Sequence, residues 1–428
     1  MKNIKITKEN KTLLSNTIMM YIMMASSFIF PLLTFPYLTR TLGKENYGII
    51  VLANAVMQYF QLLIDYGFIL SGTALCSKER NNKERLQHIT SAIIYSKLLL
   101  SALGLVIVTI LALSLDLFDG KELFIICSYI PLTLTSFVPD FLFRGIEKMD
   151  IITYRTVAAK AAYTALIFLF VKNPQSYYFI PFSLAISNLI IVIWSWSYIK
   201  KKLGMRIMKV RLRDIKTQLK ESSTFFASRI ATTVYSASNI FALGLFGYSD
   251  AAIGIYGASN TLIGYGKSMF SPIADSIYPY MIKNKNHKLV KKIIGYLMPI
   301  IVLGCIVLYC ISGWFIKLMC GEGYQESVPY FRLMIPMLAI TLPSYLYGFP
   351  MLGSIGRNDK ANQSVIVGAI FHFIGLLILF LTKTMNFYNV IILTTITETI
   401  ILIYRLVCFA KYSKRPIIIK GEKNERRK

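Results

Sequence analysis

Long apolar segments alternate with short polar links along almost the whole chain. Each apolar segment has about 20 residues or more, the length of helix that crosses the hydrocarbon core of a bilayer. We expect twelve such spans, and the pattern therefore predicts an all-α integral membrane protein. The expected spans lie near residues 13–38, 46–75, 88–114, 123–142, 153–171, 178–199, 222–246, 253–282, 293–316, 328–352, 362–381 and 389–410.

The most basic stretch of the chain, Lys200 to Lys220, lies in its middle. Nine of these 21 residues are Lys or Arg and one is acidic, so we expect the stretch at a membrane surface and not in lipid. It divides the chain into four predicted parts. These are an N-terminal six-helix lobe at 1–199, a basic cytoplasmic connector at 200–221, a C-terminal six-helix lobe at 222–410 and a basic cytoplasmic tail at 411–428.

The distribution of positive charge predicts the orientation in the membrane. The chain is 55% hydrophobic and carries a formal net charge of +26. If both termini are cytoplasmic, the cytoplasmic segments hold 35 Lys and Arg residues and the external links hold 6. Lys and Arg near spans stay on the cytoplasmic face, which predicts this orientation. Since the charge lies in short links between spans, we expect no nucleic-acid partner.

The two halves of the chain carry similar turn residues. Gly48 and Gly254 are 206 residues apart, while the pair Pro139 and Gly145 recurs 211 residues later as Pro350 and Gly356. Similar offsets at separate places suggest a duplicated unit of six spans, related by an axis along the membrane normal. The prediction is therefore two pseudo-symmetric lobes.

The sequence offers little for catalysis or metal binding. The six cysteines show no C-x-x-C spacing and the three histidines are scattered, so we expect no metal site and no cofactor. The external links are too short to hold a domain, and no hydrolase, glycosyltransferase or nucleotide-binding motif is present. We do not expect an enzyme.

Six basic residues remain inside the expected spans: Lys97, Lys160, Arg229, Lys267, Arg332 and Arg405. A cation at the centre of a span costs roughly 2.5 to 3.5 kcal/mol, so the four deepest should face a bundle interior or a watery cavity. Those four are Lys97, Lys160, Arg229 and Lys267. Arg332 and Arg405 lie near span ends, where snorkelling to the interface is an alternative.

Acidic residues in or near the spans are fewer: Asp65, Asp140, Asp275 and Glu398. Spacing relates Asp140 to Arg144, Asp275 to Lys267 and Glu398 to Arg405 along single helices. Two interpretations stay open, namely neutral structural pairing and a cationic cavity with a few carboxylates for ion coupling. A surplus of positive charge in a cavity favours an anionic substrate.

Several motifs together resemble one family over nearly the whole chain. They lie at 34–48, with Pro36, Arg40 and Tyr47, and at 65–68, 140–149, 225–229 and 256–259. The set in this order resembles the Wzx-type flippases of O-antigen and other polysaccharides. Phe141 and Arg144 depart from the family pattern, which often has Trp and Gln there.

The resemblance implies a MATE-like fold of two six-helix lobes around a central cavity, in the bacterial inner membrane. The implied substrate is an oligosaccharide repeat unit on undecaprenyl diphosphate, moved from the cytoplasmic to the periplasmic leaflet by alternating access. Polysaccharide polymerase and chain-length proteins are implied partners, with membrane lipid around the protein.

The expected roles of the charged residues follow from this function. We expect Lys97, Lys160, Arg229 and Lys267 to attract the diphosphate, with Arg40 and Arg332 nearer the outer exit. Candidates for coupling to a proton or a sodium ion are Asp65, Asp275 and Glu398.

Two rival functions remain open. A multidrug/cation antiporter of the same fold would need an acidic cavity, and the surplus of buried Lys and Arg counts against it. A scaffold without transport activity would not need deep lysines.

Overall fold

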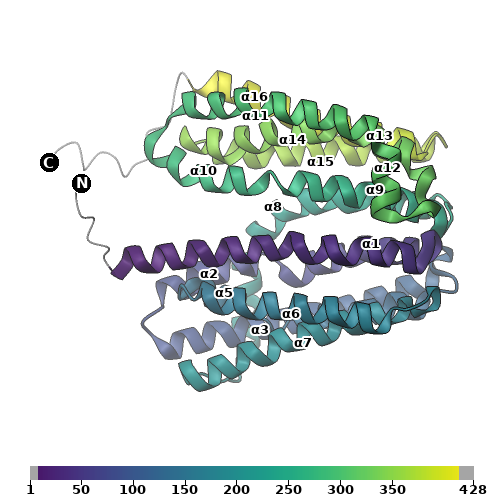
Figure 1. The fold of residues 1–428 in the computed structure, drawn as a ribbon. Coiled ribbons are helices and arrows are strands. Elements are labelled where there is room, and N and C mark those ends of the chain that lie inside the picture. The colour runs from purple at the N-terminus through teal and green to yellow at the C-terminus, as the bar shows by residue number, and fades with distance from the viewer. Residues whose placement is uncertain (1–7, 414–428) are drawn as a thin grey trace. The chain divides into compact units, whose positions relative to one another are not determined.

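The computed structural model describes residues 8–413, without the side chains of residues 8–17, 224–225, 227–229 and 231–236. All regular elements in this range are helices, which confirms the expected all-α fold. The chain forms two compact units, the N-terminal unit Met1–Thr233 and the C-terminal unit Val234–Lys428. Within each unit long helices run alongside one another (Figure 1).

The N-terminal unit is built on α1, which packs against α6, while α7 packs against both α4 and α6. Helix α8 (Leu212–Leu245) contains the division between the units. The elements before it are α1 (Lys8–Asp65), α2 (Phe68–Lys78), α3 (Lys83–Ser114), η1 (Asp116–Phe118), α4 (Glu122–Thr135), α5 (Asp140–Gly145), α6 (Met149–Phe170), η2 (Pro174–Tyr178), α7 (Phe179–Tyr198) and η3 (Ile199–Leu203).

The C-terminal unit has α15 packed along α16, and α16 also contacts α13 and α14. Its elements are α9 (Asp250–Ser268), α10 (Ser271–Asn284), α11 (His287–Cys310), α12 (Ser312–Cys320), η4 (Glu322–Ser327), α13 (Val328–Met334), α14 (Pro336–Leu346), η5 (Tyr347–Leu352), α15 (Asn358–Leu381) and α16 (Phe387–Tyr412).

Each of the twelve expected spans is helical over most of its length. By length and composition, seven helical stretches of the described chain could cross a membrane, or eight if a pair bent by 43° at Ile335 is one span. The first of them, Ile18–Lys78, contains both of the first two expected spans. The helices near 153–171, 222–246 and 253–282 are not among these stretches, because their polar residues lower the mean hydropathy.

Local sequence explains where several helices break or begin. Gly43 interrupts α1 with φ 71° and Gly247 follows α8 with φ 91°, a left-handed conformation that glycine adopts without a side-chain penalty. Asparagine side chains cap three helices: Asn82 accepts from the amide of Arg85, Asn286 from that of Leu289, and Asn386 from that of Asn389. Such caps satisfy backbone donors that have no partner within the helix.

One turn recurs in both units and refines the predicted repeat. In the N-terminal unit Glu147 has φ 61°, and the amide of Lys148 donates to the carbonyl of Phe143. In the C-terminal unit Gly356 has φ 75°, and Arg357 donates to Leu352 in the same way. Glu147, and not Gly145, is thus the local counterpart of Gly356.

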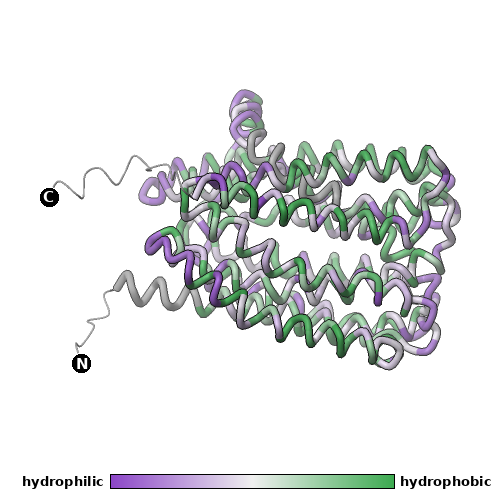
Figure 2. The backbone as a smooth tube through the Cα atoms, turned by 90° about the horizontal axis from the view of Figure 1, so that it is seen from above, coloured by the Kyte–Doolittle hydropathy of each residue, from purple (hydrophilic) through white to green (hydrophobic). Residues whose placement is uncertain are grey.

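Apolar side chains cover the outside of the helices as well as the cores. The N-terminal core gathers around Phe68, Phe141 and Ile152, and the C-terminal core around Leu342 and Met351. Helices of both units are hydrophobic along most of their length, with hydrophilic residues toward their ends (Figure 2). On α11, Ile300 is 65% and Leu303 63% exposed, as expected for a surface that faces lipid.

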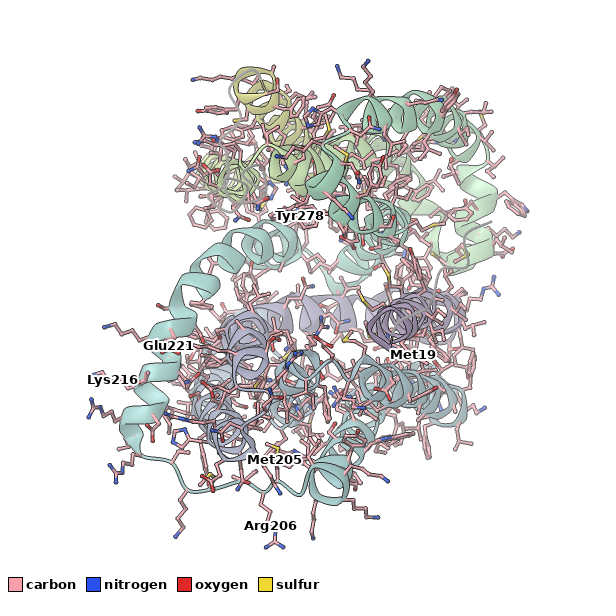
Figure 3. All side chains as sticks on the ribbon, turned by 90° about the vertical axis from the view of Figure 1, so that its left-hand side faces the viewer. Met19, Met205, Arg206, Lys216, Glu221 and Tyr278 are labelled. Carbon is pink, nitrogen blue, oxygen red and sulfur yellow. The ribbon has the colours of Figure 1, made fainter. Side chains whose placement is uncertain are left out.

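The basic stretch between the predicted lobes is partly anchored to the N-terminal unit. It forms η3, an extended segment at 204–211 and the first turns of α8. Met205 is buried in the N-terminal core, and the amide of Met208 donates to Ser91 Oγ at 3.0 Å. Arg206 and Lys216 point away from the helices (Figure 3). This stretch therefore has an apolar anchor and a cationic outer face.

Candidate functional site

A cavity of about 360 Å³ lies within the N-terminal unit. Helices α1 to α7 all contribute to its lining, so it lies where the helices of this unit converge. Its charged lining residues are Asp65, Lys97, Asp140, Arg144 and Arg155. Three cations and two carboxylates give the cavity a positive surplus.

Lys97 of α3 is held in this cavity by one hydrogen bond and has a carboxylate nearby. Its side chain is only 6% exposed, and Nζ donates to the carbonyl of Thr135 at 2.9 Å. Asp65 Oδ1 lies 4.0 Å from Nζ, which is longer than a direct hydrogen bond. The lysine thus faces the interior, as its insertion cost predicted, and Asp65 offsets its charge.

Arg155 of α6 is a buried cation that is not among the six basic residues expected inside spans. The side chain is 1% exposed, pairs with Asp140 and donates to Ser195 Oγ. Its guanidinium carbon also lies 5.1 Å from the centre of the Phe143 ring. Asp140 therefore pairs with Arg155 and not with its helix neighbour Arg144. The sequence signal was the position of Arg155 inside the expected span 153–171.

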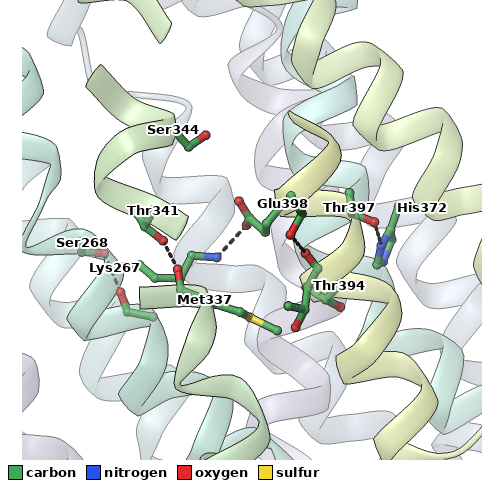
Figure 4. A network of polar contacts seen from close by, with 12 residues as sticks. Lys267, Ser268, Met337, Thr341, Ser344, His372, Thr394, Thr397 and Glu398 are labelled. Carbon is green, nitrogen blue, oxygen red and sulfur yellow. Dashed lines mark hydrogen bonds and ion pairs between the residues drawn. The ribbon is translucent and has the colours of Figure 1, made fainter. Parts of the chain in front are cut away.

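The C-terminal unit holds a second ion pair, which joins half-buried Lys267 of α9 to buried Glu398 of α16 (Figure 4). Lys267 Nζ lies 2.6 Å from Glu398 Oε1, and the two side chains are 21% and 8% exposed. Sequence spacing instead related Lys267 to Asp275 and Glu398 to Arg405. The pair joins residues 131 positions apart, which spacing along one helix cannot reveal.

Arg405 does not snorkel to the interface, which the sequence left open as an alternative. It is buried on α16, where its Nε donates to Ser364 Oγ at 2.9 Å. Its Nη1 donates to the carbonyl and the hydroxyl of Ser344. These bonds hold a permanent positive charge inside the C-terminal unit.

The remaining predicted residues are not among those that line the cavity. Half-buried Lys160 donates to Ser27 Oγ at 2.6 Å, and Arg332 donates to Ser312 Oγ at 2.6 Å. Exposed Asp275 accepts from Ser271 Oγ at 3.4 Å.

Arg40 and Arg229 complete the predicted set. Arg40 is exposed on α1 just before the break at Gly43. Arg229 lies on α8, and its side chain is outside the described residues. Arg40 and Lys160 belong to the N-terminal unit but are not among the residues that line the cavity.

Sequence reasoning set aside His372 with the other histidines, yet it is fully buried on α15 close to Glu398 (Figure 4). Over the residues with described side chains, no three His, Cys, Asp or Glu residues are grouped to hold a metal ion. The arrangement can bind an anion in the N-terminal cavity, and each unit has one lysine near a carboxylate, with one member of the two buried.

Comparisons of sequence agree with the family resemblance. Residues 13–285 match the family described as polysaccharide biosynthesis protein. A protein of Escherichia coli (strain K12) named "Putative O-antigen transporter" is 27% identical over 377 residues, which cover 86% of this chain and 90% of that protein. A protein of the same name from Shigella dysenteriae is 25% identical over 401 residues, which cover 91% and 98% of the two chains.

Comparisons of structure confirm the MATE-like membrane fold. An inward-facing multidrug resistance MATE family transporter of the MOP superfamily matches with a TM-score of 0.67 and 15% identity, over 94% of this chain and 100% of that one. The lipid II flippase MurJ in an inward closed conformation also gives a TM-score of 0.67, with 10% identity over 93% and 87% of the two chains. At such identities the likeness establishes the fold alone.

Proposed function

Because the chain belongs to the polysaccharide biosynthesis protein family, we propose that it flips lipid-linked oligosaccharide repeat units across the bacterial inner membrane. The substrate is an oligosaccharide on undecaprenyl diphosphate, which moves from the cytoplasmic to the periplasmic leaflet by alternating access. Both termini are cytoplasmic, and a polysaccharide polymerase and chain-length proteins use the product. The relatives named as O-antigen transporters support this proposal.

The observation that carries the proposal is the cationic cavity of the N-terminal unit. A diphosphate cannot enter hydrocarbon without a cationic partner, because an unpaired charge in a low-dielectric medium is expensive. The cavity provides Lys97, Arg144 and Arg155 against two carboxylates. Its volume of about 360 Å³ falls within the range of small-ligand sites, so it accommodates a diphosphate but not an extended oligosaccharide.

Two of these cations are suited to receive the diphosphate. Arg155 is already paired with Asp140 and bonded to Ser195. Arg144 is exposed, and Lys97 donates to the carbonyl of Thr135 but approaches the Asp65 carboxylate only to 4.0 Å. A phosphate oxygen replaces that long contact with a charge-assisted hydrogen bond, which is shorter and stronger. We assign the diphosphate to Lys97 and Arg144, while Arg155, paired with Asp140, is a fixed part of the cavity wall.

The other predicted residues keep their proposed roles. Lys267, Lys160 and Arg229 are further cations for the head group, and Arg40 and Arg332 lie nearer the outer exit. Transport is ion-coupled, with Asp65 and Glu398 as the first candidates because each has a lysine beside it. Asp275 is a weaker candidate, since it is exposed and lies on α10.

The test is complementation of a strain that lacks the gene. Lys97→Gln and Arg144→Gln should each lower surface polysaccharide, while lipid-linked repeat units accumulate on the cytoplasmic leaflet. A hydrogen bond to a charged group contributes about 1.5 to 3 kcal/mol, so the loss should be about tenfold or more. The matched control is Lys317→Gln, since Lys317 is an exposed lysine paired with exposed Glu322.

Three outcomes are distinguishable at equal protein level. Loss of polysaccharide in the two cavity variants but not in the control supports the proposal. Normal export in both cavity variants rejects the cationic cavity as the substrate site. Continued surface polysaccharide in the deletion strain itself, with altered drug sensitivity, points to the multidrug antiporter instead.

A further inference from the structure

A chain of hydrogen bonds surrounds the buried imidazole of His372 in the C-terminal unit. His372 Nε2 lies 2.8 Å from Asn239 Oδ1, and Nδ1 lies 3.0 Å from Thr397 Oγ1. The ring is 0% exposed. Helices α8, α15 and α16 supply these three residues, so the ring is bonded on both sides inside a bundle.

The partners on the Asn239 side determine which ring nitrogen carries a proton. The Thr394 hydroxyl donates to the carbonyl of Val390 at 2.7 Å, so its oxygen accepts from Asn239 Nδ2 at 2.9 Å. Asn239 therefore presents its carbonyl oxygen to the ring, and an amide carbonyl only accepts hydrogen bonds. His372 Nε2 must be a donor, which leaves Nδ1 as the nitrogen that gains or loses a proton.

The Thr397 hydroxyl can serve both protonation states of Nδ1. It lies 2.8 Å from the carbonyl of Leu393, to which it donates. When Nδ1 carries a proton, Nδ1 donates to Thr397 and the hydroxyl keeps its bond to Leu393. When Nδ1 is bare, the hydroxyl rotates and donates to Nδ1. A hydroxyl has one proton to donate and can accept as well, so neither state leaves the ring unsatisfied.

The surroundings of the ring act on its protonated state in opposite directions, because burial disfavours the charge and a nearby carboxylate favours it. Glu398 follows Thr397 on α16 and interacts electrostatically with the ring, and Lys267 of α9 pairs with that carboxylate. Tyr256 of α9 is also buried and hydrogen-bonds Asn239. Because Lys267 already offsets the charge of Glu398, the ring is neutral in this conformation, and it accepts a proton only where water reaches it.

We propose that His372 is a proton-binding site of the C-terminal unit, which takes up a proton at Nδ1 and releases it during each transport cycle. The proton comes from water on one side of the membrane and returns to water on the other, with no other bond changed. Because the ring is buried in this conformation, the exchange needs a second conformation, which alternating access supplies. The link to transport rests on the proposed function, whereas the binding of the proton does not.

The direct test follows the histidine rings by NMR in the full-length protein, labelled at histidine and placed in lipid nanodiscs. The chain has only three histidines, so His88→Asn and His287→Asn leave the His372 signal assigned. The proposal predicts that this ring gains a proton as the pH falls from about 8 to about 4. A His372 ring that stays neutral over that whole range overturns the proposal.

The second test measures flipping of the lipid-linked oligosaccharide in proteoliposomes with an imposed pH gradient. Wild type and His88→Asn should respond to the gradient, since one titrating group changes its protonation ratio about tenfold per pH unit. His372→Gln keeps hydrogen-bonding atoms but cannot take up this proton, so it should lose the response. If this variant does not fold, the titration of the wild-type ring still decides.

The outcomes separate this proposal from the proposed function. Wild-type flipping that ignores the gradient overturns the coupling role of His372 and leaves the flippase intact. A wild type that flips nothing counts against the proposed function, and the NMR titration then judges the proton site alone. A His372→Gln variant that is folded and still responds to the gradient overturns the proposal.

Discussion

At the scale of single residues, the main feature of both units is charged pairs in which one member is buried and the other partly exposed. The N-terminal unit holds Lys97 near Asp65 and Arg155 against Asp140, and the C-terminal unit holds Lys267 against Glu398. Removing two charges from water costs free energy, and the pair recovers it only when both members are present. Each pair therefore adds little to the net stability of the protein, but removal of one member alone should be strongly destabilising.

A double-mutant cycle on Lys267 and Glu398 tests this dependence. Lys267→Gln alone leaves a carboxylate that is 8% exposed without its partner, and should destabilise the protein by about 3 kcal/mol. Glu398→Gln alone should have a similar effect, while the double variant should be more stable than either single one. Thermal unfolding of purified protein in detergent measures all four. Additive losses would contradict the pairing.

The sequence predicted which lysines lie in the protein interior, but it did not predict which carboxylates pair with them. The cost of a cation in lipid correctly placed Lys97 and Lys267 in the protein interior. The partners came out differently because helical spacing relates only residues of one element, whereas Glu398 approaches Lys267 from another helix. Arg155 was missed because a residue at the edge of an expected span can belong to either the link or the helix.

At the scale of elements, small residues set how closely helices approach. Gly368 of α15 packs against α16: a methyl group placed on it would lie 2.5 Å from Ile401 Cγ1, well inside contact distance. Gly304 on α11 has nothing within 4 Å of the same position. The two glycines therefore have different roles, although both lie inside apolar helices of 24 residues.

Gly368→Ala should destabilise the C-terminal unit by about 1 to 3 kcal/mol, because overpacking forces α15 and α16 apart. Gly304→Ala is the matched control and should be neutral or stabilising by up to about 1 kcal/mol, since alanine favours helix. Thermal unfolding in the same detergent compares the two. Equal melting temperatures would contradict the close packing of α15 on α16.

The sequence was most informative about the positions of helices and turns. Apolar length placed a helix in each expected span, and the break near Gly43 fell in the predicted first link. The repeated turn was located but aligned two residues off, because Gly145 suggested the position that Glu147 holds. Glycine is often but not always the residue with left-handed backbone, so the sequence alone does not show which residue of the turn has a positive φ.

The whole molecule is a multi-pass membrane protein, and its charge asymmetry predicts its orientation. Cytoplasmic segments would hold 35 Lys and Arg residues against 6 in the external links. Alkaline phosphatase, which is active only in the periplasm, should be active when fused after Lys121 or Lys317 and inactive after Lys209. A fluorescent protein that matures in the cytoplasm should show the reverse. Phosphatase activity after Lys209 would contradict the orientation.

The central claim is that the protein moves a lipid-linked oligosaccharide between leaflets. The most direct measurement reconstitutes the purified full chain in liposomes that contain fluorescent undecaprenyl-diphosphate oligosaccharide, and follows the fraction protected from a quencher outside. The account predicts rapid exchange of label between leaflets with wild type and Lys317→Gln. Exchange should be slower by about tenfold or more with Lys97→Gln. Wild-type liposomes that exchange no faster than protein-free ones would contradict it.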